Sequence, residues 1–279
     1  MQISSTFGTL SAGDAGASAG ARPTWPVGAL GALTALSLAA LLIALAAAGL
    51  DARTLYGESV WAKPARFAAS FALFFATLAL VAARLSPRAQ ASRGLRAAVA
   101  VLAAAFLYEI GYIHVQAARG VSSHFNFATL AAEIHFALMG IGAVALMVYV
   151  GAIGVLAGRD SDARLGPGLR RGVRLGFLWS AALTILAGVS IALMGGPLTG
   201  APPPDAAALP LLGWSGAVGD LRPAHFLALH AMQAGPLLGL WADRRGWPVA
   251  RVRQALLSYA ALTLAVYAQA LAGYPLLAL

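Results

Sequence analysis

Histidine side chains inside long apolar segments are the residues of this chain best suited to chemistry. The chain contains five histidines. His135 and His230 stand in different apolar segments at similar depth, and neutral imidazole is a good ligand for zinc, copper or haem iron. We therefore predict that this pair binds a transition metal or a b-type haem. His114 and Glu109, which lie at comparable depth, are predicted as further metal ligands.

Two carboxyl groups, Glu109 and Glu133, are the candidate catalytic residues. A charged group inside a membrane costs a few kcal/mol on insertion scales, so it normally faces the bundle interior and pairs there. Such carboxyl groups can carry protons or bind a metal. An ion pair with Arg119 or Arg66, or a protonated glutamate bound to a tyrosine, explains them equally well, and both interpretations stay open.

Helix geometry limits which of these groups can meet. At 100° per residue, Glu109 and His114 point in different directions, and Glu133 and His135 point nearly opposite ways. No single segment carries a chelating pair of the H-E-x-x-H kind. A metal or haem would therefore have to be bound between helices.

The other polar candidates gather in or just beyond three connections between apolar segments. They could bind a small solute or an anion, because several are cationic and the backbone N–H groups at a helix start accept anions. Helix capping by Ser123 or Asn126, and a simple Asp–Arg pair before the sixth segment, are the competing interpretations. The candidate residues are Lys63, Arg66, Arg119, His124, Asn126, Asp220, Arg222, His225 and Gln233.

Seven apolar segments must position these residues. Each is long enough to cross a hydrocarbon core, which needs about 20 residues. They lie at about 27–50, 65–84, 96–117, 127–157, 173–195, 224–242 and 252–276. The third, fourth, sixth and seventh segments place ionisable or amide groups at similar depth. We predict one polar pocket between these four spans, open to the outside.

The basic residues predict the orientation of the spans. Of the 19 basic residues, 14 lie in the N-terminal tail and in the connections after the second, fourth and sixth segments. Cytoplasmic loops collect arginine and lysine, so the N-terminus is predicted to be cytoplasmic and the C-terminus outside. The net charge of +9 then reflects topology, and no nucleic-acid partner is expected.

The composition identifies the class of protein. Hydrophobic residues make up 60% of the chain and charged residues 10%, against about 25% charged in a soluble domain. This excludes a soluble or disordered chain and predicts an all-α, polytopic membrane bundle, with the lipid bilayer as its partner. Residues 1–24 form a predicted flexible tail, and residues 25–279 a single transmembrane domain. With no cysteine, disulfides, thiolate metal sites and iron–sulfur clusters are excluded.

Three stretches carry a family resemblance. Residues 61–67 read WAKPARF, residues 119–126 read RGVSSHFN, and residues 219–226 read GDLRPAHF. They resemble the signature stretches of a bacterial multi-pass membrane family of unknown function, and the resemblance covers the chain from about residue 55 onward. It implies a location in the bacterial inner membrane and supplies no activity.

Three functions fit these observations. The leading hypothesis is redox or metal-assisted chemistry on a membrane-soluble ligand, at the His/Glu pocket. The second is a transporter that couples a small solute to protons through the same residues. The third is a structural or assembly subunit, in which the polar groups only satisfy one another. The sequence does not decide whether the protein is an enzyme, and it leaves the oligomeric state open.

Overall fold

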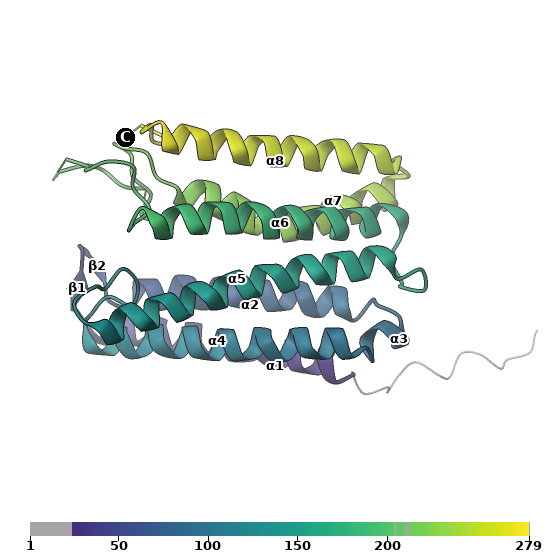
Figure 1. The fold of residues 1–279 in the computed structure, drawn as a ribbon, viewed down its shortest axis with the longest axis horizontal. Coiled ribbons are helices and arrows are strands. Elements are labelled where there is room, and N and C mark those ends of the chain that lie inside the picture. The colour runs from purple at the N-terminus through teal and green to yellow at the C-terminus, as the bar shows by residue number, and fades with distance from the viewer. Residues whose placement is uncertain (1–23, 204, 210–211, 279) are drawn as a thin grey trace, which may run out of the picture.

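The computed structural model describes residues 24–203, 205–209 and 212–278, so nearly all of the predicted tail lies outside the described residues. Within them, the chain forms seven long helices, one short helix and a two-stranded hairpin (Figure 1). The all-α bundle is confirmed. The elements are α1 (Trp25–Leu50), β1 (Thr54–Leu55), β2 (Glu58–Ser59), α2 (Ala62–Ala82), α3 (Pro87–Gln90), α4 (Arg93–Arg119), α5 (Leu130–Arg159), α6 (Pro167–Leu193), α7 (Arg222–Arg245) and α8 (Val249–Leu271).

Six of these helices are long and apolar enough to cross a membrane: α1, α2, α4, α5, α6 and α8. This supports a multi-pass membrane protein with six candidate spans, one fewer than predicted. The remaining long helix, α7, coincides with the predicted sixth span. It falls short in hydropathy because two histidines and a glutamine interrupt the apolar stretch between its charged ends.

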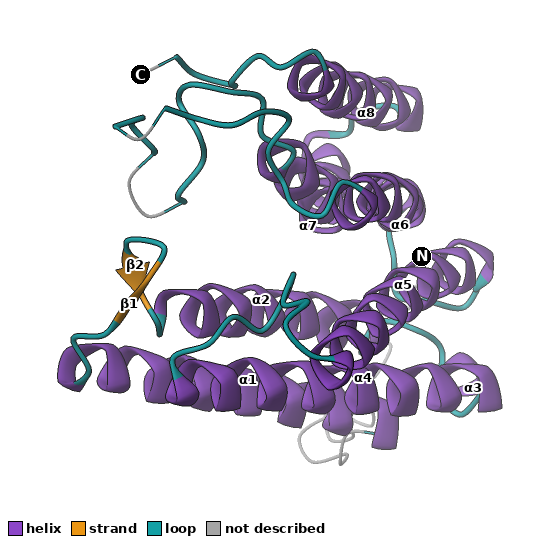
Figure 2. Cartoon of the chain, turned by 60° about the vertical axis from the view of Figure 1, so that its left-hand side comes forward, coloured by secondary structure: helices purple, strands orange, loops and turns teal. Residues whose placement is uncertain are grey.

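The helices form two groups that meet along α5 and α6. In one group α1, α2, α4 and α5 pack together, and in the other α6, α7 and α8 do so (Figures 1 and 2). Phe71, Phe75 and Phe106 fill the centre of the first group, with ring centroids of Phe71 and Phe106 5.0 Å apart. The same apolar cluster continues into α6 at Val173 and Phe177.

Glycines bring α6 and α7 into backbone contact. A Cβ atom added at Gly172 would lie 2.2 Å from the carbonyl oxygen of Gly235, and one at Gly239 would lie 2.4 Å from that of Gly168. Small residues at four-residue spacing allow such close approach between membrane helices. Any side chain at these positions would push the two helices apart.

The contact between α5 and α6 is tight over only part of their length. A Cβ added at Gly154 would lie 2.6 Å from Cβ of Phe177, and one at Gly158 would lie 2.6 Å from Cδ of Arg174. Beyond these positions, toward its N-terminus, α5 approaches α4 at Gly142 and diverges from α6 (Figure 1). The direct contact between α5 and α6 therefore joins the two groups at one end of the bundle.

The arginine-rich connections share the joined end of the bundle. The backbone N–H of Arg164 donates to the carbonyl of Arg84, and the carboxylate of Asp243 accepts from the N–H groups of Gly168 and Leu169 at 2.6 and 2.8 Å. These bonds tie the connection after α2 to the connection after α5, and the last turn of α7 to the first turn of α6. We call this the arginine-rich end.

The hairpin and the connections after α4 and α6 lie at the other end, which we call the hairpin end. Arg53 donates to the carbonyl of Ala118 at 3.0 Å, linking the chain after α1 to the end of α4. Gly219, before α7, donates to Gly273, just beyond α8, at 2.8 Å. The arginine-rich connections and the remaining connections therefore lie at opposite ends of the bundle, as the loop charges predict.

Candidate functional site

Three ionisable side chains come together inside the first helix group, near the hairpin end: Lys63, Glu109 and His124. We call them the buried cluster. His124 Nε2 lies 3.9 Å from Glu109 Oε1, and only 16% of the His124 side chain and 7% of the Glu109 side chain are exposed. Lys63 lies close enough for its charge to act on both of the other groups. The cluster combines a cation, a carboxyl group and an imidazole out of water.

The local backbone explains how residues from three elements meet. Helix α4 ends at Gly120, whose φ of +70° is the left-handed conformation that glycine adopts without strain. Val121 N–H donates to the carbonyl of Gln116 at 3.0 Å, so the chain turns back along α4. This turn carries His124 back over Glu109. Lys63 enters from the first turn of α2.

The ring of Phe67 lies near both Lys63 and His124. Nζ of Lys63 lies 5.7 Å from the centroid of the Phe67 ring, and that centroid lies 5.5 Å from the His124 ring. Ser123 Oγ lies 3.2 Å from Nδ1 of His124. Burial, helped by the positive charge of Lys63, lowers the pKa of His124 from 6.5 to about 3. The imidazole is therefore neutral at physiological pH.

Glu133, predicted beside Glu109 in depth, is exposed in the first turn of α5. The prediction placed it two to three turns inside the span because it started the helix at residue 127. The helix starts at Leu130 instead, since Thr129 Oγ1 accepts from the N–H of Ala132 at 3.2 Å and caps it. The prediction that Ser123 or Asn126 caps this helix is therefore wrong. The side-chain amide of Asn126 instead donates to the carbonyl of Ser122 within the connection.

His135 and His114 are both used in contacts between helices. Nδ1 of His135 lies 2.6 Å from the hydroxyl of Tyr108, and its ring stacks on Tyr112 with centroids 4.4 Å apart. The two ring nitrogens of His114 lie 2.8 and 3.2 Å from the carbonyl oxygens of Ile110 and Ala40. His114 therefore ties α4 to α1.

The histidines of α7 also have protein partners or tight surroundings. Nδ1 of His230 lies 3.2 Å from Oε1 of Gln233, whose amide nitrogen donates to Thr77 Oγ1 of α2 at 3.1 Å. His225 faces α6, where a Cβ added at Gly188 would lie 3.7 Å from its Nε2. His230 and Gln233 thus lie on one face of α7.

These placements bear on the metal and haem hypothesis. Within the described part of the chain, no three His, Cys, Asp or Glu side chains are grouped so that they could hold a metal ion. His135 and His230 are each bonded to a side chain of their own helix group. A metal or haem at this pair stays a prediction that the arrangement of the described residues does not support.

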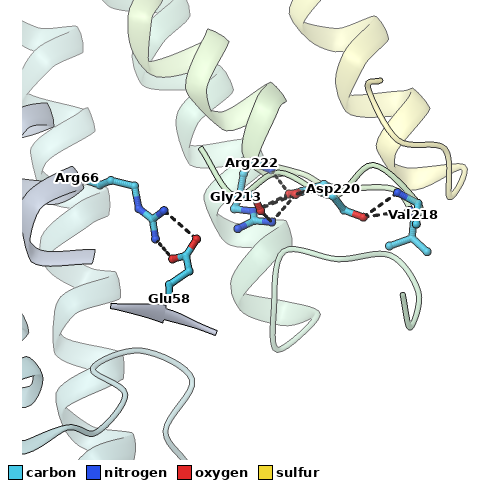
Figure 3. Close-up of polar contacts among 8 residues, drawn as sticks. Glu58, Arg66, Gly213, Val218, Asp220 and Arg222 are labelled. Atoms are coloured by element: carbon cyan, nitrogen blue, oxygen red, sulfur yellow. Dashed lines mark hydrogen bonds and ion pairs between the residues drawn. The ribbon is translucent and has the colours of Figure 1, made fainter. Parts of the chain in front are cut away.

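A second polar cluster joins the two helix groups at the hairpin end (Figure 3). Arg66 forms an ion pair with Glu58, and Arg222 forms one with Asp220 at 2.6 Å. Arg222 also donates to the carbonyl of Gly213 at 2.6 Å. A Cβ added at Gly213 would lie 2.7 Å from Glu58 Oε1 and within 4 Å of a guanidinium nitrogen of Arg66 and of Arg222. We call Glu58, Arg66, Gly213 and Arg222 the mouth cluster.

The two carboxylates of this region differ in burial. Asp220 is buried and accepts hydrogen bonds from Ser215 N–H and from the backbone and side chain of Arg222, so it holds the connection before α7 in place. Glu58 is half-buried on the hairpin. Hydrogen bonds from Arg66, with smaller effects of the charges of Arg66 and Arg222, hold the pKa of Glu58 below its ordinary value.

Arg119, the remaining candidate, is exposed at the end of α4 and donates to Gln116 at 3.3 Å. Sequence reasoning missed Glu58 and Tyr108. Glu58 follows Tyr56 and Gly57, both at positive φ, and such a turn between two short polar runs is a hairpin signal. Tyr108 lies next to Glu109 in sequence, and only the rotation of α4 against α5 shows that it meets His135.

Comparison with known proteins adds no assignment. No protein-family model, no curated protein and no solved structure matches this chain. The family resemblance of the three stretches therefore stays a prediction. The function has to be inferred from the buried cluster, the mouth cluster and the arrangement of the two helix groups.

Proposed function

We propose that this protein is a seven-span carrier of the bacterial inner membrane that couples the movement of a small solute to protons. The observation that carries the proposal is the buried cluster of Lys63, Glu109 and His124. A charge inside a membrane is costly. A titratable group that is buried there is therefore explained by a function more often than by a contribution to stability.

The seventh span is α7. It lies alongside α6 from Asp243, which caps the start of α6 at Gly168, to His225, which faces Gly188. That stretch of α6 is about 20 residues, or about 30 Å at 1.5 Å per residue, which equals the thickness of the hydrocarbon core. Because α6 is itself apolar enough to span, α7 crosses the membrane beside it with its polar groups turned toward protein.

The arginine-rich end faces the cytoplasm. It carries the basic connections after α2, α5 and α7, and short loops rich in arginine stay on the cytoplasmic side. The hairpin end then faces outward, and both the buried cluster and the mouth cluster lie in the outer half of the bundle. The helix groups are closely packed between α5 and α6 toward the cytoplasmic end, and at the outer end the mouth cluster bridges them.

Charge balance gives the mechanism of coupling. With His124 neutral, Lys63 supplies the positive charge of the cluster and Glu109, when it is ionised, supplies the negative charge. Moving a charged solute through the outer half changes the total charge in a medium of low dielectric constant, where charges interact strongly. A proton added to or lost from Glu109 offsets that change. The energetically favoured path therefore moves the solute and the proton together.

A structural or assembly subunit is the second candidate. It is favoured by His114, whose two ring nitrogens both lie at backbone carbonyls, and by Asp220, whose contacts all lie within one connection. In that case Glu109 would contribute to stability and to nothing else.

Proteoliposomes test the proposal directly. The purified chain would be reconstituted with a pH-sensitive dye inside, and inward gradients of impermeant sulfonates, amino acids and quaternary amines would be applied in turn. We expect at least one solute to change the internal pH. Glu109→Gln should abolish that change, and Glu133→Gln, at an exposed glutamate in the first turn of α5, should retain it. A pH change that survives in Glu109→Gln would refute the proposal, and the absence of any response in the unaltered protein would favour the structural subunit.

A further inference from the structure

The outer parts of α2 and α7 turn one face toward each other. Gln233 of α7 donates to Thr77 of α2 at 3.1 Å, which fixes the two faces at their lower end. Residues three, four or seven positions away along a helix lie on the same face. Following that spacing toward the hairpin end, the facing rows are Arg66, Ser70, Leu73 and Thr77 on α2, and Arg222, Phe226, His230 and Gln233 on α7.

These two faces are not packed against each other between their ends. Leu73 is 45% exposed and Phe226 is 41% exposed, although each lies on the face turned to the opposite helix. His230 stacks against Phe226, with ring centroids 4.1 Å apart, and Trp214 lies against the other side of Phe226 at 5.6 Å. An unpacked stretch with apolar and aromatic walls thus lies between the Thr77–Gln233 bond and the mouth cluster. We call it the outer gap.

Two guanidinium groups lie at the upper end of the outer gap. Arg66 and Arg222 come from different helix groups, and a point beside Gly213 lies within 4 Å of both guanidinium groups and of the Glu58 carboxylate. Arginine binds carboxylate and sulfonate-like oxygens through two parallel hydrogen bonds. In this structure the carboxylate of the chain's own Glu58 holds that position (Figure 3).

We propose that the outer gap binds an amphiphilic monoanion, whose head group takes the place of Glu58 between Arg66 and Arg222. Its apolar body would lie against Leu73 and Phe226. That this anion is also the transported solute rests on the proposed transport function. The binding itself does not require transport.

Glu58 acts as a built-in competitor for this site. It stands on a two-residue strand after the turn at Tyr56 and Gly57, so a small movement of the hairpin withdraws it. A group tethered to the same chain competes at a high effective concentration. Removing its charge should therefore strengthen the binding of an external anion, and removing one arginine should weaken it.

Equilibrium binding of octanesulfonate to the purified full chain, below its micelle concentration, tests the inference. Binding would be followed by tryptophan fluorescence, with Trp214→Phe identifying the signal of the residue beside the gap. We expect Glu58→Gln to tighten binding about tenfold and Arg222→Gln to weaken it by at least that factor, as for loss of a charge-assisted hydrogen bond. Arg119→Gln, an exposed arginine at the same end, is the matched control and should bind normally.

Two ligand controls define the contradicting results. Octanol has the same apolar body without charge, and octyltrimethylammonium has the opposite charge. Equal affinity for octanol, or an unchanged affinity in Glu58→Gln, would overturn the inference even if Arg222→Gln fails to fold. Because no proton gradient is applied, anion binding without proton-linked uptake would refute the carrier function alone. Proton-linked uptake of other solutes without anion binding would refute this inference alone.

Discussion

At the scale of single residues, similar side chains near the hairpin end have different surroundings. His114 and His135 are fixed by a carbonyl and a tyrosine, whereas His124 is buried beside a carboxyl group and near a lysine. Glu109 is buried and Glu133 is exposed. Residue type and depth predicted all five as candidates. Only the local backbone, above all the turn after Gly120 and the cap at Thr129, separates the clustered residues from the others.

His124 should make folding stability depend on pH. Its pKa is about 3 in the folded protein and 6.5 when exposed, so between these values the unfolded chain binds more protons. Stability should therefore rise with pH across this window. His124→Gln should flatten that rise, which thermal unfolding of the two purified proteins at a series of pH values would show. An identical slope in both proteins would mean that His124 is not buried in neutral form.

At the scale of elements, the long apolar segments predicted every long helix, because about 20 apolar residues have few other ways to fold in a membrane. The ends were less predictable. The last helix ends at Leu271 and not near residue 276, since Gly273 takes a φ of +89° beyond it. The hairpin and the four-residue α3 were missed because neither has an apolar pattern.

The pairing of helices could not be predicted from the sequence, because it depends on how each helix is rotated against its neighbours. The repeat of Gly168, Gly172 and Gly176 meets Gly235 and Gly239 in the structure, a contact between segments about 60 residues apart. The same applies to the site. The depth of Glu109 followed from the sequence, and its closeness to His124 and Lys63 did not.

The backbone contact of α6 and α7 should be sensitive to a single methyl group. Gly172→Ala would place Cβ 2.2 Å from the carbonyl oxygen of Gly235, and overpacking of this kind costs about 1–3 kcal/mol. Gly111→Ala is the matched control, since a Cβ there meets nothing within 4 Å and alanine favours a helix. Thermal unfolding should show a lowered midpoint for Gly172→Ala only. Equal midpoints would mean that the helices are further apart than described.

At the scale of the whole molecule, the charges sort the bundle into two ends with different tasks. The arginine-rich end holds the helix groups together, and the proposed orientation places it in the cytoplasm. The hairpin end carries the buried cluster, the outer gap and the mouth cluster. In the proposed topology the +9 charge of the chain reflects the cytoplasmic loops, and the residues proposed for function are the few charged groups that remain at the other end.

Single cysteines can map this topology, because the chain has none of its own. Exposed positions are available before and after α6 and α7: Ser161, Ala217 and Ala250. A membrane-impermeant maleimide should label Ala217→Cys in intact cells, and should label Ser161→Cys and Ala250→Cys only after the membrane is opened. Labelling of Ala217→Cys and Ala250→Cys from the same side would show that α7 does not cross.

The central claim is that Glu109 couples the solute to protons, and one pair of uptake measurements on the same proteoliposomes tests it. With radiolabelled octanesulfonate, the unaltered protein should accumulate solute when a pH gradient is imposed and should also exchange it at equal pH. Glu109→Gln should lose the accumulation driven by the pH gradient while it keeps the exchange. Accumulation by Glu109→Gln equal to that of the unaltered protein would contradict the account, and so would an equal loss of accumulation and exchange.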